Sequence, residues 1–275
     1  MKTLNYLYTL LLAAASLHTV QAQKADDLAA NRVIITGVRF SYPLVEQWIK
    51  RYKEAHPEAN IVIESRNVSD PAKYDLLIEA YEQDATIRET REYAYVARYA
   101  LLPVANAKSA FAKKFADKGL TRDLIKQIYF NDIYADKRAQ KKIDVNYTIY
   151  TRLQKAGAPI TFAKYFGFEQ ANIKGNTIAG ADEHLIKSLL KDTLGISYSV
   201  PGLLYNLKTR KVADGLTVIP VDTDDSGRVS DDEKFYDNLD VVLEKLQAGD
   251  LKNVPTEHIH LKPSLSKNNY QLNFI

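Results

Sequence analysis

The segment from Asp222 to Glu233 carries the clearest chemical pattern in the sequence. It reads DTDDSGRVSDDE, with oxygen-bearing side chains at alternate positions, a glycine in the middle and a glutamate at the end. Ca²⁺ takes six to eight hard oxygen ligands. Alternate side chains of a loop that curls around the ion can supply them, and Gly227 permits the sharp turn. The spacing therefore predicts a calcium-binding loop.

The segment matches the calcium loop of EF-hands along its whole length. The predicted ligands are Asp222, Asp224, Ser226, Ser230 and Glu233, together with the backbone carbonyl of Arg228. The alternative is an acidic turn in which Ser230 caps a helix over residues 234–246 and Glu233 completes a capping box. Because a strand ending at Pro220 precedes the loop, we expect an isolated structural brace and not a paired calcium sensor.

Two histidines, His258 and His260, alternate along a predicted strand and share a face. Such a pair can bind a metal, but no third ligand is apparent in the sequence, which favours a structural role.

Composition narrows the class of protein. The 275 residues suffice for one large domain or two modest ones. A net charge of +3 without a basic–aromatic patch argues against nucleic-acid binding. The absence of cysteine excludes disulfides and thiolate chemistry. The sequence has no nucleophile elbow and no metalloprotease motif, so we do not expect an enzyme.

The N-terminus has the three parts of a secretory signal. Lys2 precedes an apolar run over residues 7–17, and Val20-Gln-Ala22 forms a small-x-small cleavage site. We predict a signal peptide over residues 1–22 and a periplasmic or secreted protein. The alternative is a buried N-terminal helix. The apolar run is too short to span a membrane.

Strand and helix patterns alternate along the rest of the chain. A strand over residues 31–37, a helix over 43–53 and a strand over 60–64 form the first unit, and helices over 109–118 and 121–129 follow. This order predicts an α/β fold with mostly parallel sheets. In such sheets, ligands bind beyond the carboxyl ends of strands, which singles out the loops at residues 37–43 and 152–159.

The order of these segments resembles the phosphate-binding proteins of phosphate ABC transporters, which are type II periplasmic binding proteins. The resemblance is carried by ITG followed by F-x-Y-P-L-x-x-x-W, by VARYALLPVAN and by LTRDLIKQIYFNDI, and it extends over residues 31–250. It implies a two-lobed type II periplasmic-binding-protein fold with a mostly parallel sheet in each lobe. Residues 23–105 plus 198–275 would form lobe 1, with the calcium loop, and 106–197 lobe 2.

The resemblance also implies an anion site at helix N-termini. Its predicted ligand residues are Arg39, Phe40, Ser41, Ser65, Arg152, Gly157 and Ala158. The alternatives are that Arg39 is a solvated surface residue, that Phe40 belongs to the core and that Arg152 only caps or pairs with a neighbouring carboxylate. The match is partial, because Ala156-Gly-Ala158 stands where the family has Ser-Gly-Thr, and two hydroxyls are missing. A phosphate site without these donors would desolvate the anion without fully replacing its hydrogen bonds.

The expected function is therefore that of an exported, soluble, monomeric solute-binding protein. It would bind a small phosphate-like anion between two lobes for uptake through a membrane transporter, with calcium as a structural cofactor. The alternative is a non-transport interaction or sensor protein on the same fold with a diverged ligand site.

Overall fold

The computed structural model describes residues 32–64, 73–81, 94–136, 138, 142–249 and 251–263. The predicted signal peptide and the predicted ligand residue Ser65 lie outside this part of the chain. Within it, no helix is both long and apolar enough to cross a membrane.

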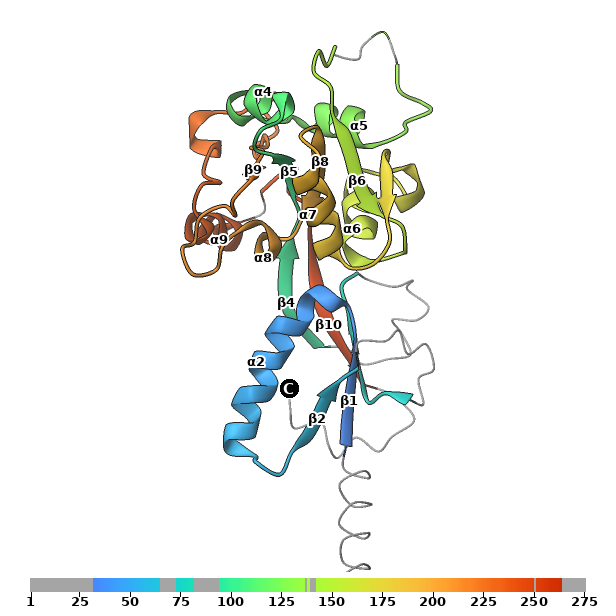
Figure 1. Cartoon of the computed structure of the whole chain (residues 1–275), viewed down its shortest axis with the longest axis vertical. Helices are drawn as coiled ribbons and strands as arrows, with labels where there is room; N and C mark the ends of the chain where they lie inside the picture. Colours follow the sequence, from blue (N-terminus) through green and yellow to red (C-terminus); the bar gives the residue numbers. More distant parts are fainter. Residues whose placement is uncertain are drawn as a thin grey trace, which may run out of the picture. The chain divides into compact units, whose positions relative to one another are not determined.

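The chain starts with the predicted strand–loop–helix–strand unit. β1 (Arg32–Gly37) leads through the short 3₁₀ helix η1 (Arg39–Ser41) into α2 (Tyr42–Ala55), and β2 (Asn60–Ile63) follows. Pro43 stands in the first turn of α2, where its missing N–H costs no hydrogen bond. β1 pairs in parallel with β2 and with β3 (Leu76–Glu79). Figure 1 shows α2 running beside β1 and β2.

Both predicted helices of the next segment form. Ser109 caps α4 by accepting from the N–H of Ala112, and Thr121 caps α5 by accepting from the N–H of Leu124. The remaining elements are β4 (Ala94–Ala100), β5 (Leu102–Asn106), α4 (Ala110–Lys118), α5 (Arg122–Tyr129), β6 (Thr148–Arg152), α6 (Gly157–Tyr165), η3 (Gln170–Asn172), β7 (Asn176–Ile178), α7 (Asp182–Lys191), β8 (Gly195–Ser199), α8 (Pro201–Leu204), β9 (Leu216–Val218), η4 (Asp231–Glu233), α9 (Leu239–Ala248) and β10 (Thr256–Pro263).

Two five-stranded sheets have equivalent strand orders. The first runs β2-β1-β3-β10-β4 and the second β7-β6-β8-β5-β9. In the first sheet β1 lies between β2 and β3, and in the second β6 lies between β7 and β8. The fourth strand of each sheet, β10 or β5, comes from a distant segment of the chain. The second sheet is mixed, because β6 is parallel to β7 and β8 whereas β5 is antiparallel to β8 and β9. By this correspondence, β1 of the first sheet is equivalent to β6 of the second.

The chain divides into two compact units, but at different boundaries from those expected. One unit takes the described residues up to Ile78 and after His260, and the other takes residues 79–81 and the described residues from Ala94 to His260. Residues 94–105 and 198–260, including the loop at 222–233, were expected in lobe 1 but lie in the second unit. The physical reason is that β5 pairs with β8 and β9, which keeps those segments together.

Aromatic side chains fill the core of the second unit. The rings of Phe162 and Tyr198 stack with centroids 3.9 Å apart, and Phe130 and Phe166 pack around Phe162 at 5.4 Å. Phe162 belongs to α6 and Tyr198 to β8, so this core includes the elements next to the predicted ligand loop. The packing therefore fixes the frame from which that loop extends.

The predicted start of the helix over residues 234–246 is wrong. η4 ends at Glu233, residues 234–238 are irregular, and α9 begins at Leu239, where Asn238 accepts from the N–H of Asp240. Tyr236 is 3% exposed and stacks on Phe235. Burial of this tyrosine and the separate cap at Asn238 explain why the helix starts later.

Candidate functional site

The loop between β1 and α2 contains three of the predicted anion ligands. Arg39 is exposed, Phe40 is half-buried and Ser41 is buried. The Ser41 hydroxyl donates to the carbonyl of Val38 at 2.7 Å, and the Ser41 N–H donates to the same oxygen at 3.2 Å. In this arrangement the Ser41 hydroxyl can only accept from a ligand, for example from a protonated oxygen.

Backbone contacts fix the shape of this first loop. The N–H of Val38 donates to the carbonyl of Ile78 at 3.0 Å, and the hydroxyl of Tyr42 donates to the carbonyl of Gly37 at 2.9 Å. Gly37 has φ 139°, and a Cβ there would collide with the carbonyl of Ile78. A glycine is therefore required where β1 ends beside β3.

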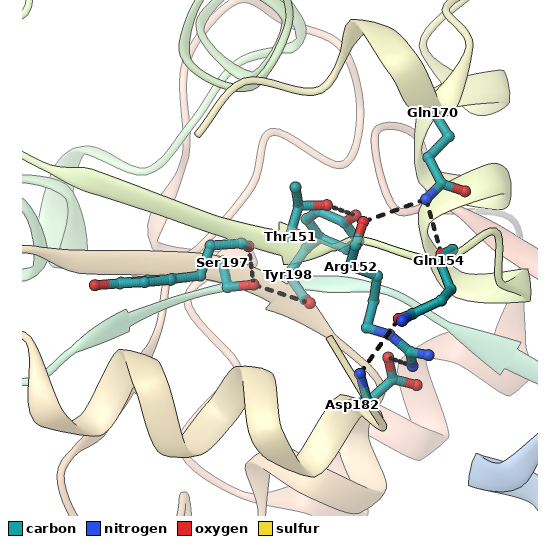
Figure 2. Close-up of polar contacts among 9 residues, drawn as sticks. Thr151, Arg152, Gln154, Gln170, Asp182, Ser197 and Tyr198 are labelled. Atoms are coloured by element: carbon teal, nitrogen blue, oxygen red, sulfur yellow. Dashed lines mark hydrogen bonds and ion pairs between the residues drawn. The ribbon is translucent and has the colours of Figure 1, made fainter. Parts of the chain in front are cut away.

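The second loop follows β6, the strand equivalent to β1, and begins with Arg152. Nη1 of Arg152 donates to Oδ1 of Asp182, the first residue of α7, at 2.7 Å (Figure 2). The two side chains are only 13% and 12% exposed. A pair buried to this extent holds the guanidinium in one orientation. Asp182 was not among the residues that the sequence singled out.

Two glutamines tie down the loop behind Arg152. Nε2 of Gln170 donates to the carbonyls of Arg152 at 3.3 Å and of Gln154 at 3.0 Å (Figure 2). Oε1 of Gln154 accepts from the N–H of Gly180 at 3.2 Å. Neither glutamine was predicted, because nothing in the local sequence links positions 154, 170 and 180.

Two atoms of this network remain unsatisfied. Nε of Arg152 and Oε1 of Gln170 are buried and find no hydrogen-bond partner among the described residues. A buried polar group without a partner costs about 1–3 kcal/mol. The Nε–H of Arg152 is thus a donor that an anionic oxygen would satisfy.

The N-terminus of α6 presents backbone and no hydroxyl. Ala156 stands at the N-cap and provides no side-chain cap, and Gly157 and Ala158 are buried. A Cβ on Gly157 would lie 2.7 Å from the Cβ of Ala80, so the helix start packs tightly against that residue. The first N–H groups of a helix have no partner within it and favour an anion. This end of α6 therefore offers backbone donors but not the two hydroxyl donors of the phosphate-binding family.

Two buried tyrosines support the same region. The hydroxyls of Tyr198 and Thr151 lie 2.8 Å apart, and the hydroxyl of Tyr99 donates to the carbonyl of Ala80 and lies 2.8 Å from that of Thr161. Burial raises the pKa of both tyrosines well above the ordinary value. They stay neutral at physiological pH and act as hydrogen-bonding supports.

The structure groups the predicted anion ligands by unit. Arg39, Phe40 and Ser41 belong to the first unit, and Arg152, Gly157 and Ala158 belong to the second. Besides Asp182, a second carboxylate that the sequence did not single out is Glu79, the last residue of β3, which is only 8% exposed.

Three of the six predicted calcium ligands lie close together within the second unit. Ligand atoms of Asp222, Asp224 and Glu233 all lie within 4.8 Å of one another. Both oxygens of Asp222 accept backbone N–H groups, from Ser226 at 3.0 Å and from Gly227 at 2.7 Å. These bonds fold the loop back on its first residue.

The other two oxygen donors of the loop lie next to each other. The hydroxyl of Ser226 donates to the carbonyl of Arg228 at 3.1 Å. Besides its three carboxylates, the loop thus contains a hydroxyl and a carbonyl oxygen, which are also hard oxygens of the kind that Ca²⁺ prefers.

Glu233 closes the loop from its far end. Oε1 accepts from the N–H and hydroxyl of Thr223 and from the N–H of Asp224, and Oε2 accepts from the N–H and hydroxyl of Ser230. Ser230 and Glu233 thus form the capping box of the acidic turn that was the alternative to a calcium loop, although it starts η4 and not a helix over residues 234–246. These five hydrogen bonds already fill the roughly four lone-pair sites of a carboxylate, so a cation at Glu233 would have to replace some of them.

The electrostatics of the two buried carboxylates differ. Burial raises the pKa of Asp222, against the opposing effect of the hydrogen bond from Gly227. Burial acts in the same direction on Glu233, but the bonds from Ser230 and Thr223 outweigh it and lower the pKa. The loop thus concentrates negative charge in a partly dry setting, where a cation is stabilising.

The chain is similar in structure, but not in sequence, to known proteins. No protein-family model matches the sequence, and no curated protein sequence matches it. Solved structures do match. A protein from Clostridium perfringens, described as a phosphate ABC transporter substrate-binding protein with bound phosphate, is 16% identical with a TM-score of 0.61, and the match covers 88% of this chain and 89% of that one.

Two further structures are similar. An ABC-type phosphate transport receptor from Vibrio cholerae is 12% identical with a TM-score of 0.57, over 88% of this chain and 91% of that one. The CcmR regulatory domain from Synechocystis, in complex with 2-PG, is 11% identical with a TM-score of 0.51, over 86% and 89%. The chain has the type II periplasmic-binding-protein fold. The expected fold class is thereby confirmed, except that the second sheet is mixed and not mostly parallel, because β5 runs antiparallel to β8 and β9. Identities this low establish nothing about the ligand.

Proposed function

We propose that the protein binds a small anion at the loop that follows β6 and that the loop at residues 222–233 holds a structural Ca²⁺. The observation that carries the first part is the buried Nε–H of Arg152, which has no partner among the described residues. An anion oxygen would pair with it without disturbing the bond between Arg152 and Asp182.

Two features of the architecture support anion binding. The β1 and β6 loops follow equivalent strands of two sheets that share one strand order, and each leads into a helix N-terminus. Helix N-termini and a fixed guanidinium are the usual donors to an oxyanion. The Clostridium perfringens protein that shares this fold has phosphate bound.

Phosphate itself is not the best-matched ligand of the second loop. Alanines at 156 and 158 supply no hydroxyl. The site offers a guanidinium and backbone N–H groups, a set that also suits a planar carboxylate. We therefore assign the ligand to small anions as a class.

For the loop at residues 222–233, the fit to calcium rests on its own geometry. Asp222, Asp224, Ser226, the carbonyl of Arg228 and Glu233 would hold the ion, and Ser230 would orient Glu233. Extracellular modules of this kind bind calcium with a Kd of about 10⁻⁴–10⁻³ M. The ion would neutralise the carboxylates and secure the connection between β9 and α9.

We also propose that the chain is exported and delivers its ligand to a membrane transporter. The N-terminal sequence supports export. Two proteins with the same fold are described as components of phosphate ABC transport, which supports the transport role.

Isothermal titration with phosphate, sulfate and succinate tests the anion site. We expect saturable binding of at least one of them, weakened about tenfold or more in an Arg152→Met, Asp182→Asn double variant, because a charge-assisted hydrogen bond contributes about 1.5–3 kcal/mol. The double variant removes both charges together and leaves neither buried alone. Equal affinity of wild type and double variant would remove Arg152 from the site.

A second candidate is a sensor or interaction protein on the same fold. It is favoured by the likeness to the CcmR regulatory domain and by the engagement of Arg152 with Asp182 inside its own unit. The absence of heat with all three anions, together with an intact calcium response, would favour this candidate over transport.

A further inference from the structure

Asn253 is a buried polar residue in a backbone conformation that few residues adopt. It lies between α9 and β10, is 1% exposed and has φ 62°. Asparagine tolerates this left-handed conformation better than most residues. All of the contacts described below lie within the second unit.

The side-chain amide of Asn253 holds the calcium loop from outside. Its Nδ2 donates to the backbone carbonyl of Asp222 at 2.7 Å and to Oδ1 of Asp225 at 3.2 Å. Asp222 is the first predicted calcium ligand and has no exposed surface. Asn253 thereby fixes the peptide that carries this ligand.

The same residue contacts the C-terminal end of α6. Its backbone N–H donates to the hydroxyl of Tyr165, the last residue of the helix, at 2.9 Å. Its Oδ1 accepts from Nη1 of Arg122 at 3.2 Å, while Nη2 of Arg122 donates to the carbonyl of Tyr165 at 3.1 Å. The guanidinium also lies over the rings of Tyr165 and Phe166, at 5.4 and 5.2 Å.

These contacts form one continuous path from the calcium loop to the anion loop. The path runs from Asp222 through Asn253 and Arg122 to Tyr165, and then along α6 to Gly157 at its other end. A helix of nine residues is a rigid rod about 13 Å long. A shift of the Asp222 peptide would therefore also displace the N-terminal end of α6 at Gly157.

We propose that Asn253 is a positioning residue that links occupancy of the calcium loop to the ordering of α6. A cation that draws in the Asp222 carboxylate fixes the Asp222 carbonyl, and this strengthens the bond from Asn253 and its contacts to Tyr165 and Arg122. By linkage, ordering of α6 tightens calcium binding by the same factor. The inference rests on the calcium part of the proposed function and is independent of which anion binds.

Hydrogen exchange of the purified protein, measured with calcium and with chelator, tests the link. The test variant is Asn253→Gly, because glycine adopts φ 62° without strain and only the side-chain amide is lost. The matched control is Asn238→Gly, which removes an asparagine side chain from the cap of α9, elsewhere in the same unit. Glycine at an N-cap costs only a few tenths of a kcal/mol relative to asparagine.

We expect calcium to slow exchange over residues 157–166 by about fivefold or more in wild type and in Asn238→Gly, a coupling of ordinary size. In Asn253→Gly the slowing should fall below about twofold, and the calcium Kd should rise about tenfold, as for other losses outside the ligand shell. Undiminished slowing in Asn253→Gly would overturn the inference but leave the calcium site standing. No response to calcium in wild type would overturn both.

Discussion

At the scale of single residues, Asp222 combines full burial with a negative charge. Carboxylates are rarely buried without a partner, and here both oxygens accept backbone N–H groups. These bonds take one lone-pair site on each oxygen and leave the charge in place next to Asp224 and Glu233. A cation would neutralise it.

We therefore predict that Asp222→Asn abolishes the calcium dependence of stability. In wild type, about 10 mM calcium should raise the melting temperature by about 3–6 °C over chelator, from a gain of about 1.4 kcal/mol. The control Asp231→Asn alters an exposed acid of the same segment that pairs with Lys234. It should keep the full shift. A full shift in Asp222→Asn would show that the ion binds elsewhere.

The ion pair of Arg152 gives a second prediction at this scale. Arg152→Met leaves Asp182 buried without its partner, and we expect the free energy of unfolding to fall by about 3 kcal/mol. Arg32→Met breaks a more exposed pair with Glu64 and should cost at most about 1 kcal/mol. Urea denaturation measures both, and similar losses would mean that Arg152 is effectively solvated.

The sequence predicts some of these residues and not others for a clear physical reason. Asp222, Asp224 and Glu233 belong to one short loop, so their spacing alone predicts that they converge. Asp182 and Asn253 reach their partners across 30 and 31 positions, and such contacts depend on tertiary packing that no local pattern records.

At the scale of elements, α6 connects the proposed anion loop at its N-terminus with Arg122 at its C-terminus. Its N-terminal Gly157 packs against Ala80, its C-terminal Tyr165 contacts Arg122, and its Phe162 stacks on Tyr198 in the core. Both ends and the middle of the helix are thus fixed within the second unit.

Gly157→Ala should destabilise the protein by about 1–3 kcal/mol, because the added methyl would meet the Cβ of Ala80 at 2.7 Å. Gly202→Ala is the matched control, since nothing lies within 4 Å of its Cβ position in α8. Alanine there should be neutral or stabilising by up to about 1 kcal/mol. If thermal or urea denaturation shows the two variants to be equally stable, α6 is not packed as described.

A single local signal, such as a capping residue, predicts the start of a helix well when no other interaction competes with it. Thr121 and Ser109 mark the starts of α5 and α4 correctly. The helix after Glu233 was placed too early, because the apolar spacing around Phe235 has a second explanation in the burial of Tyr236.

At the scale of the whole molecule, the fold was predictable from the order of segments, and the boundary between the units was not. The alternation of strands and helices predicts the α/β class. The pairing of β5 with β8 and β9, in contrast, joins segments that lie about ninety or more residues apart in the sequence, such as Ala105 and Ile196. That pairing places the loop at residues 222–233 in the same unit as Arg152 and α6.

The most direct test of a calcium-braced anion-binding protein is its melting temperature in four conditions. These are chelator alone, calcium alone, an anion alone and both together, with phosphate, sulfate and succinate as the anions. We predict that calcium and at least one anion each raise the melting temperature, the anion by about 5 °C or more at a hundredfold excess over its Kd. A melting temperature that is the same in all four conditions, for every anion, would contradict the account.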